Sequence, residues 1–145
     1  MIEGMIDVSD KPSVPRQAKA SGLLHLRDET AAAISNGPLK KGDVLEASTI
    51  AAIQAVKDTP RIVPHCHPIP IEGCWVEWDW ENSNLRCTVT VKAKYRTGVE
   101  MEALTGVSAG LLCAWDMVKS MEKDDTGQYP SARMTDIVVL EKLKG

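Results

Sequence analysis

The chain has 145 residues, of which 43% are hydrophobic and 26% are charged, and its formal net charge is −3. This length predicts one domain with its own core, and the composition is that of an ordinary globular protein. The acidic balance and the short apolar runs argue against a nucleic-acid-binding protein and against a membrane span, and the N-terminus lacks the features of a signal peptide. We therefore expect a cytoplasmic protein without nucleic-acid or membrane partners.

The first quarter of the chain predicts an arm followed by two helices. Residues 1–20 are polar and contain two prolines, so we expect an extended N-terminal arm that orders on a partner or a ligand. We expect residues 21–145 to form a single α+β domain. It begins with a short strand at 23–26, a helix at 28–35 with Asp28 as N-cap, and a helix from Asp43 to about residue 56.

Two lysines, Lys40 and Lys41, stand on the loop between these helices. A solvated turn is the ordinary explanation of such a pair. The glycine that follows, Gly42, lets a ligand approach the backbone closely, which favours a binding role for the pair.

Three prolines within residues 64–70 fix the backbone around His65, Cys66 and His67. Such rigid placement of polar side chains suits a binding site. A satisfied surface histidine is the ordinary alternative, and a zinc site built on the two histidines is another. Because His25 is the only other histidine, we assign no metal site.

The second half of the chain predicts a hairpin, a long helix and a last strand. In residues 85–95 apolar and polar side chains alternate, which indicates a strand with one buried face. Residues 74–80 supply its partner across a turn at 82–84. A helix over 99–122 carries an apolar stripe, and residues 137–140 form a strand. The order of strands and helices along the chain predicts an α+β domain, in which helices pack against an antiparallel sheet. The stripe comprises Leu104, Val107, Ser108, Leu111, Leu112, Trp115 and Val118.

Charged residues mark both ends of the helix at 99–122. Glu100 and Glu102 begin it, and Asp116 and Lys119 lie near its end beside the apolar stripe. A solvated Asp–Lys pair would add only a few tenths of a kcal/mol, roughly, whereas a half-buried pair could serve as acid and base. Glu102 and Asp116 share a helix face but lie roughly 21 Å apart along the axis. We therefore expect a composite site in which the two come from different subunits.

Four motifs then occur in order: KKGDV at 40–44, PxCHP at 64–68, TGVEMEALT at 97–105 and DMxK at 116–119, after an opening IDVS at 6–9. With these motifs the chain resembles the MoaC family of molybdenum cofactor biosynthesis from about residue 5 to residue 142. The resemblance implies a lyase that converts 3′,8-cyclo-7,8-dihydroguanosine 5′-triphosphate to cyclic pyranopterin monophosphate and releases pyrophosphate. It also implies a ferredoxin-like core, a homohexamer built as a trimer of dimers with sites at subunit interfaces, and a functional link to a radical-SAM GTP cyclase.

The resemblance also implies roles for individual residues. Asp116 matches the catalytic aspartate, and Lys41 and Lys119 match the catalytic lysines. The implied substrate contacts are His65, Cys66, His67, Glu100, Met101, Glu102 and the tail lysine Lys142. His65 departs from the family, which has an apolar residue there, and the tail is short. No cofactor is implied, and a magnesium ion on the triphosphate stays open. The alternative is a non-catalytic pterin- or nucleotide-binding protein on the same scaffold.

Overall fold

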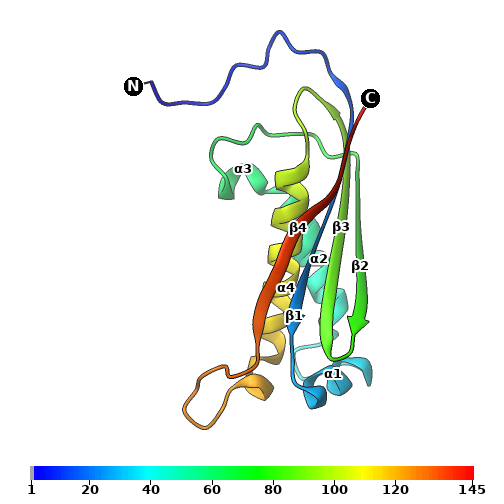
Figure 1. Cartoon of the computed structure of the whole chain (residues 1–145), viewed down its shortest axis with the longest axis vertical. Helices are drawn as coiled ribbons and strands as arrows, with labels where there is room; N and C mark the ends of the chain where they lie inside the picture. Colours follow the sequence, from blue (N-terminus) through cyan, green and yellow to red (C-terminus); the bar gives the residue numbers. More distant parts are fainter. Residues whose placement is uncertain (1) are drawn as a thin grey trace.

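The chain forms a four-stranded antiparallel sheet with helices packed against it, and the computed structural model describes residues 2–145. The strand order is β2-β3-β1-β4. Together with the βαββαβ order of strands and crossovers, this is the ferredoxin-like arrangement, so the predicted α+β class is confirmed. No helix within residues 2–145 is long and apolar enough to cross a membrane. The elements are β1 (Val14–His25), α1 (Asp28–Ser35), α2 (Val44–Lys57), α3 (Thr59–Ile62), β2 (Gly73–Glu81), β3 (Asn84–Tyr95), α4 (Glu100–Glu122) and β4 (Arg133–Lys144) (Figure 1).

The hairpin of β2 and β3 confirms the clearest prediction from the sequence. The two strands pair from Gly73 opposite Lys92 to Glu81 opposite Asn84. Asn82 adopts a positive φ of 57° in the connecting turn, a conformation that asparagine tolerates. The apolar positions of β3 face the helices and are buried, as the alternation required.

Strand β1 corrects the predicted N-terminal arm. The strand begins at Val14 and lies in the middle of the sheet, between β3 and β4, so residues 14–20 belong to the core. Its core positions are small: Ala18 and Ala20 are both 0% exposed. An added Cβ at Gly22 would lie 2.9 Å from side-chain atoms of Val107. Small residues between polar ones conceal a strand in the sequence, although they let α4 approach the sheet closely.

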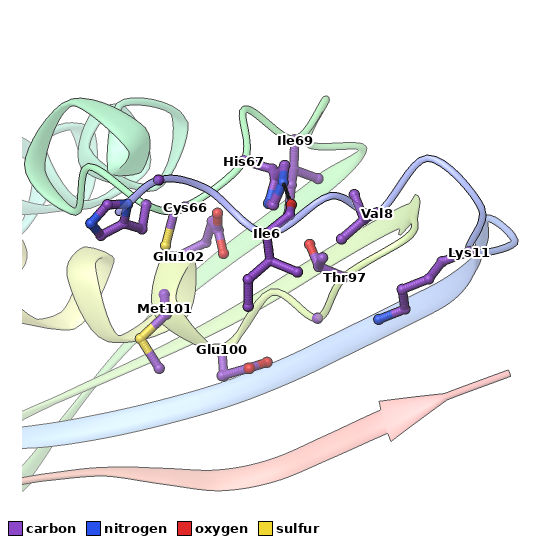
Figure 2. Close-up of a pocket in the computed structure, with 13 residues that line it drawn as sticks. Ile6, Val8, Lys11, Cys66, His67, Ile69, Thr97, Glu100, Met101 and Glu102 are labelled. Carbon is purple, nitrogen blue, oxygen red and sulfur yellow. Dashed lines mark hydrogen bonds between the residues drawn. The ribbon is translucent and has the colours of Figure 1, made fainter. Parts of the chain in front are cut away.

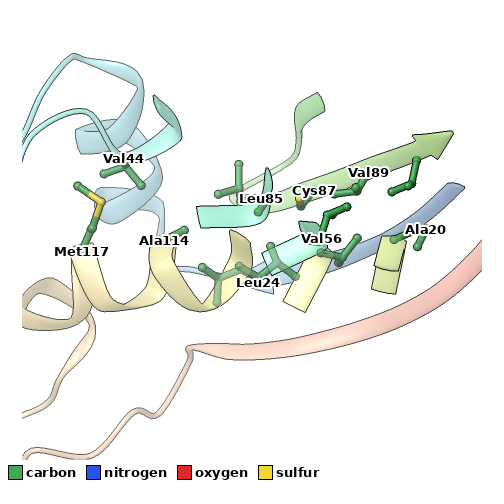
Figure 3. Packing of buried hydrophobic residues seen from close by; sticks show 14 of the residues in the cluster. Ala20, Leu24, Val44, Val56, Leu85, Cys87, Val89, Ala114 and Met117 are labelled. Atoms are coloured by element: carbon green, nitrogen blue, oxygen red, sulfur yellow. The ribbon is translucent and has the colours of Figure 1, made fainter. Parts of the chain in front are cut away.

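Helix α4 is continuous, and its buried stripe agrees with the predicted one at Val107, Leu111 and Val118 and differs from it elsewhere. Its buried face includes small residues, and an added Cβ at Gly106 would lie 2.7 Å from Val56 of α2. Figure 3 shows Val56 and Ala114 within this core. Leu112, predicted in the core, is 61% exposed. Glycine and alanine allow α2 and the sheet to approach α4 closely. The buried face of α4 is therefore centred on these small residues and leaves some of the large apolar ones exposed.

The shorter elements agree with the predictions apart from their ends. Asp43 is the N-cap of α2 and accepts a hydrogen bond from the Glu46 backbone N–H. In α1 the N-cap is Arg27, so Asp28 is the first helical residue and the predicted cap was one position late. The last strand is longer than predicted and runs from Arg133 to Lys144 at an edge of the sheet.

Candidate functional site

The residues predicted to act in the site gather at the two opposite ends of α4, the long helix of Figure 1. At its N-terminal end a pocket of about 510 Å³ contains all the predicted substrate contacts from the PxCHP and TGVEMEALT motifs. We call it the Glu102 pocket. At the C-terminal end Lys41, Asp116 and Lys119 form the Asp116 cluster. The Glu102 pocket is lined by Gly4, Ile6, Val8, Lys11, His65, Cys66, His67, Ile69, Thr97, Gly98, Glu100, Met101 and Glu102.

Three segments distant in the sequence build the Glu102 pocket (Figure 2). The proline-rich segment supplies one wall, and a turn at its start is closed by a hydrogen bond from the Cys66 N–H to the Val63 carbonyl. The turn between β3 and α4 supplies Thr97, and the first turn of α4 supplies the carboxylates. The N-terminal arm, residues 2–13, covers the remaining side.

The N-terminal arm was expected to order on a partner or a ligand, but none of its residues was predicted to belong to the site. Nε2 of His67 lies 2.8 Å from the carbonyl oxygen of Ile6, which holds the arm against the proline-rich segment. Val8 is buried, and the Ile6 side chain points into the pocket in Figure 2. Lys11 also lines the pocket. The opening IDVS motif was the signal that could have identified this contribution.

The two glutamates of the Glu102 pocket lie in different surroundings. Glu102 is 2% exposed, and burial raises the pKa of its carboxyl group, with the Glu100 charge adding to the effect. Glu100 receives Lys142 at 3.3 Å from Nζ to Oε1, so β4 delivers the predicted tail lysine to this end of the molecule. The other oxygen of Glu100, Oε2, is buried and has no hydrogen-bond partner within residues 2–145. The pocket therefore offers acceptors to a ligand that carries N–H groups.

Cys66 lies beside Glu102 in Figure 2. Burial raises the pKa of its thiol, and the charges of Glu102 and Glu100 raise it further. Because the thiolate is the reactive form, Cys66 is suited to contact a ligand and is poorly suited to act as a nucleophile.

The Asp116 cluster is built from α4 and from the loop before α2. Lys119 Nζ lies 2.9 Å from Asp116 Oδ1, one turn away along the helix. Lys41 Nζ lies 3.4 Å from Asp116 Oδ2 and donates to the Asp116 backbone carbonyl at 3.1 Å. Gly42 directs this loop with a positive φ of 113°.

Pairing, rather than burial, sets the pKa values of the Asp116 cluster. The Asp116 side chain is 57% exposed, so the single chain shows the solvated pair and not the half-buried alternative. Lys119 first, and then Lys41, lower the pKa of Asp116, while Asp116 raises the pKa of Lys119. The cluster thus presents an ionised carboxylate between two ammonium groups, which suits proton transfer next to a phosphate-bearing ligand.

The two sites cannot contact one small ligand within a single chain. Helix α4 is unbroken between Glu102 and Asp116, which places them roughly 21 Å apart along its axis. The residues also offer no obvious metal centre, since no group of three or more His, Cys, Asp or Glu side chains in the described chain is arranged to hold an ion.

Comparison with known proteins adds independent evidence. The model of the MoaC family matches residues 5–145. A protein of Methanospirillum hungatei named "Probable cyclic pyranopterin monophosphate synthase" is 51% identical over 97% of this chain and 90% of its own length. Proteins with the same name from Thermococcus kodakarensis and Archaeoglobus fulgidus are 50% and 52% identical, again over 97% of this chain and 90% of their own lengths.

Proposed function

The chain belongs to the MoaC family, and we propose that it is a cyclic pyranopterin monophosphate synthase. Its reaction converts 3′,8-cyclo-7,8-dihydroguanosine 5′-triphosphate to cyclic pyranopterin monophosphate and pyrophosphate, an early step of molybdenum cofactor biosynthesis. The observation that carries the proposal is the pairing of a pocket rich in acceptors with an exposed Lys–Asp–Lys cluster, both built from the family's motifs.

The Glu102 pocket holds the guanine-derived ring in this proposal. A guanine-like edge presents several N–H donors, which the carboxyl oxygens of Glu100 and Glu102 can accept. Glu102 is buried and its pKa is raised, so it can also be protonated and donate a hydrogen bond to a ring carbonyl. The rigid segment with His65, Cys66 and His67 adds backbone contacts.

The Asp116 cluster performs proton transfer and stabilises phosphate charge. Rearranging a reduced purine into a pterin requires protons to be moved, and the ionised Asp116 can accept one. Closing the cyclic phosphate forms a P–O bond at the α-phosphorus while the bond to the bridging oxygen breaks and pyrophosphate leaves. Lys41 and Lys119 supply positive charge for that leaving group.

Two further lysines bring positive charge to the Glu102 pocket, Lys11 from its lining and Lys142 from beside Glu100. Lys142 is partly neutralised by Glu100. Lys11 lines the same pocket and forms no ion pair with any residue in the range 2–145. Lys11 is therefore available to bind a phosphate oxygen. We assign Lys11 and Lys142 to phosphate binding. In this assignment the N-terminal arm carries Lys11 over the ligand.

We place the complete site at a subunit interface within a homohexamer, a trimer of dimers. One surface of the single chain favours association, because Met101 and Leu112 of α4 are 40% and 61% exposed next to an exposed apolar edge strand. A neighbouring copy packed there would bring its Asp116 cluster to the Glu102 pocket and bury the Asp–Lys pair. The edge strand contributes Ile137, Val138, Val139, Leu140 and Leu143.

The proposed reaction fixes the remaining partners. We infer that a radical-SAM GTP cyclase supplies the cyclised substrate, and the nucleotide origin of that substrate supports a cytoplasmic location. A magnesium ion that arrives on the triphosphate belongs to the substrate.

The deciding experiment is release of pyrophosphate from the cyclised substrate by the purified protein. We expect stoichiometric pyrophosphate and cyclic pyranopterin monophosphate. The alternative, a non-catalytic pterin- or nucleotide-binding protein, predicts tight binding of the substrate without release, and that result would overturn the proposal. Asp116→Asn provides the control, since it should bind substrate and release no pyrophosphate.

A further inference from the structure

The N-terminal end of α1 and the C-terminal end of α4 cap each other through Arg27, Thr30 and Glu122, which we call the Glu122 clasp. Glu122 is 0% exposed. Its Oε2 accepts hydrogen bonds from the Thr30 hydroxyl and, at 3.1 Å, from the Arg27 backbone N–H. In return, the Arg27 guanidinium donates to the Glu122 carbonyl at 2.7 Å and to the Lys123 carbonyl at 3.4 Å.

Both halves of the Glu122 clasp provide hydrogen-bond partners for backbone groups at helix ends, which would otherwise have none. Arg27 stands at the N-cap of α1 and makes no side-chain cap, so the Glu122 carboxylate takes that role from another helix. A carboxylate at a helix N-terminus and a guanidinium at a helix C-terminus also suit the two helix dipoles. Helix α1 has only eight residues and would not be stable alone, so its position depends on such contacts.

Helix α1 leads directly to the loop that carries Lys41. Leu39 and Gly42 exchange two backbone hydrogen bonds of 2.9 Å, and Asp43 then caps α2, so the loop is short and well braced. Glu122 lies on the same helix as Asp116. The Glu122 clasp and the contact between Lys41 and Asp116 therefore join the same two parts of the chain.

We propose that the Glu122 clasp positions Lys41 against Asp116, and that Arg27, Thr30 and Glu122 are positioning residues for the reaction of the Asp116 cluster. The side chains of Lys41 and Asp116 are 49% and 57% exposed, so in this chain their geometry depends on the backbone that carries them and little on surrounding packing. The kinetic consequence rests on the proposed function, whereas the geometric consequence does not.

Thr30→Val is the sharpest variant, because it removes one donor from the Glu122 clasp and changes neither the shape of the side chain nor any charge. Misplacing a catalytic group by about 1 Å can cost up to roughly 100-fold in rate, so we expect kcat to fall about tenfold with KM within about twofold. Glu122→Gln keeps an oxygen acceptor and should retain most of the rate that Glu122→Ala loses. If Glu122→Ala does not fold, Thr30→Val decides.

The matched control is Val76→Ala on β2, at the sheet edge away from the Asp116 cluster. Val76→Ala removes apolar contacts and should lower the stability of the fold. Thr30→Val and Val76→Ala are therefore compared at temperatures where each is fully folded. A purely structural role for the Glu122 clasp predicts equal kcat in Thr30→Val and Val76→Ala, and that equality would overturn the proposal.

A second readout does not depend on turnover. Lys41 is one of the two lysines that lower the pKa of Asp116, so Lys41→Ala should raise that pKa. Thr30→Val should raise it part of the way, measured by NMR titration of the Asp116 carboxyl carbon. An Asp116 pKa unchanged in Thr30→Val but raised in Lys41→Ala contradicts the proposal. If the wild type releases no pyrophosphate, the proposed function fails while this titration still tests the Glu122 clasp.

Discussion

The two ends of α4 place carboxyl groups in opposite surroundings. Glu102, in the first turn, is 2% exposed, and burial raises its pKa although the helix N-terminus would favour an anion. Asp116, about four turns later, is 57% exposed, and two lysines lower its pKa. The comparison teaches that local surroundings move the pKa values of two carboxyl groups on one helix in opposite directions.

The largest expected effect on activity comes from substitutions in the Asp116 cluster, at the exposed end of α4. Asp116→Asn and Lys41→Ala should each reduce pyrophosphate release by about 10³-fold or more, because proton transfer and charge stabilisation are lost together. Both side chains are exposed in the single chain, so the fold of each subunit should stay intact, and gel filtration checks that the proposed oligomer also persists in both variants. Lys57→Ala, which removes an exposed lysine at the end of α2, is the control and should keep full activity. More than a tenth of wild-type activity in either variant would remove that residue from the catalytic role.

The next effect tests whether the two ends need a neighbouring subunit. Leu112 and Ile50 are 61% and 60% exposed on α4 and α2, so Leu112→Glu and Ile50→Glu form a matched pair. A charge inside an apolar interface is costly, and we expect Leu112→Glu to dissociate the oligomer and to lower activity about 100-fold. Light scattering after gel filtration measures the mass. An intact, active oligomer in Leu112→Glu, or dissociation in Ile50→Glu, would place the interface elsewhere.

A smaller effect concerns stability at the buried end. Since the pKa of Glu102 is raised in the folded state, the folded protein holds this proton more tightly than the unfolded chain does. The proton on Glu102 therefore stabilises the folded state at low pH. This stabilisation is lost as the pH rises from near 4.5, the pKa in the unfolded chain, through the higher pKa of the folded state. Glu102→Gln should be more stable than wild type at neutral pH, and this gain should vanish at acidic pH, as measured by urea unfolding. A gain of equal size at both pH values would exclude titration of Glu102 as the cause.

The smallest expected effect is at Cys66. Because burial and the two glutamates raise the pKa of its thiol, alkylation by iodoacetamide should be slower than for free cysteine. Cys66→Ser should keep kcat within about threefold of wild type, since serine replaces a neutral thiol by a neutral hydroxyl. Rapid alkylation at neutral pH that abolishes activity, together with an inactive serine variant, would instead indicate a nucleophile.

Local pattern predicted the elements whose large apolar residues alternate or recur, such as β3 and α4. At β1 it predicted only the end of the strand, near residues 23–26, and failed before it, where Ala18 and Ala20 are buried in the core but the sequence resembles a polar arm. The motifs indicated which residues gather at each end of α4. They could not indicate Glu122, whose partner Thr30 is 92 positions away, or the contact of Ile6 with His67 across 61 positions. Such contacts exist only once the sheet has formed, so no local pattern predicts them.

The central claim is that Glu102 and Asp116 of one working site come from two chains, and subunit complementation tests it directly. Glu102→Ala and Asp116→Asn should each be inactive as pure proteins. When the two variants are co-expressed and pair at random, about half of the pairs contain one subunit of each kind. Across a two-fold interface each mixed pair has one intact site and one site with both substitutions, so about a quarter of wild-type activity should return. If co-expressed subunits exchange freely and no activity returns, the two residues act within one chain and the account is wrong.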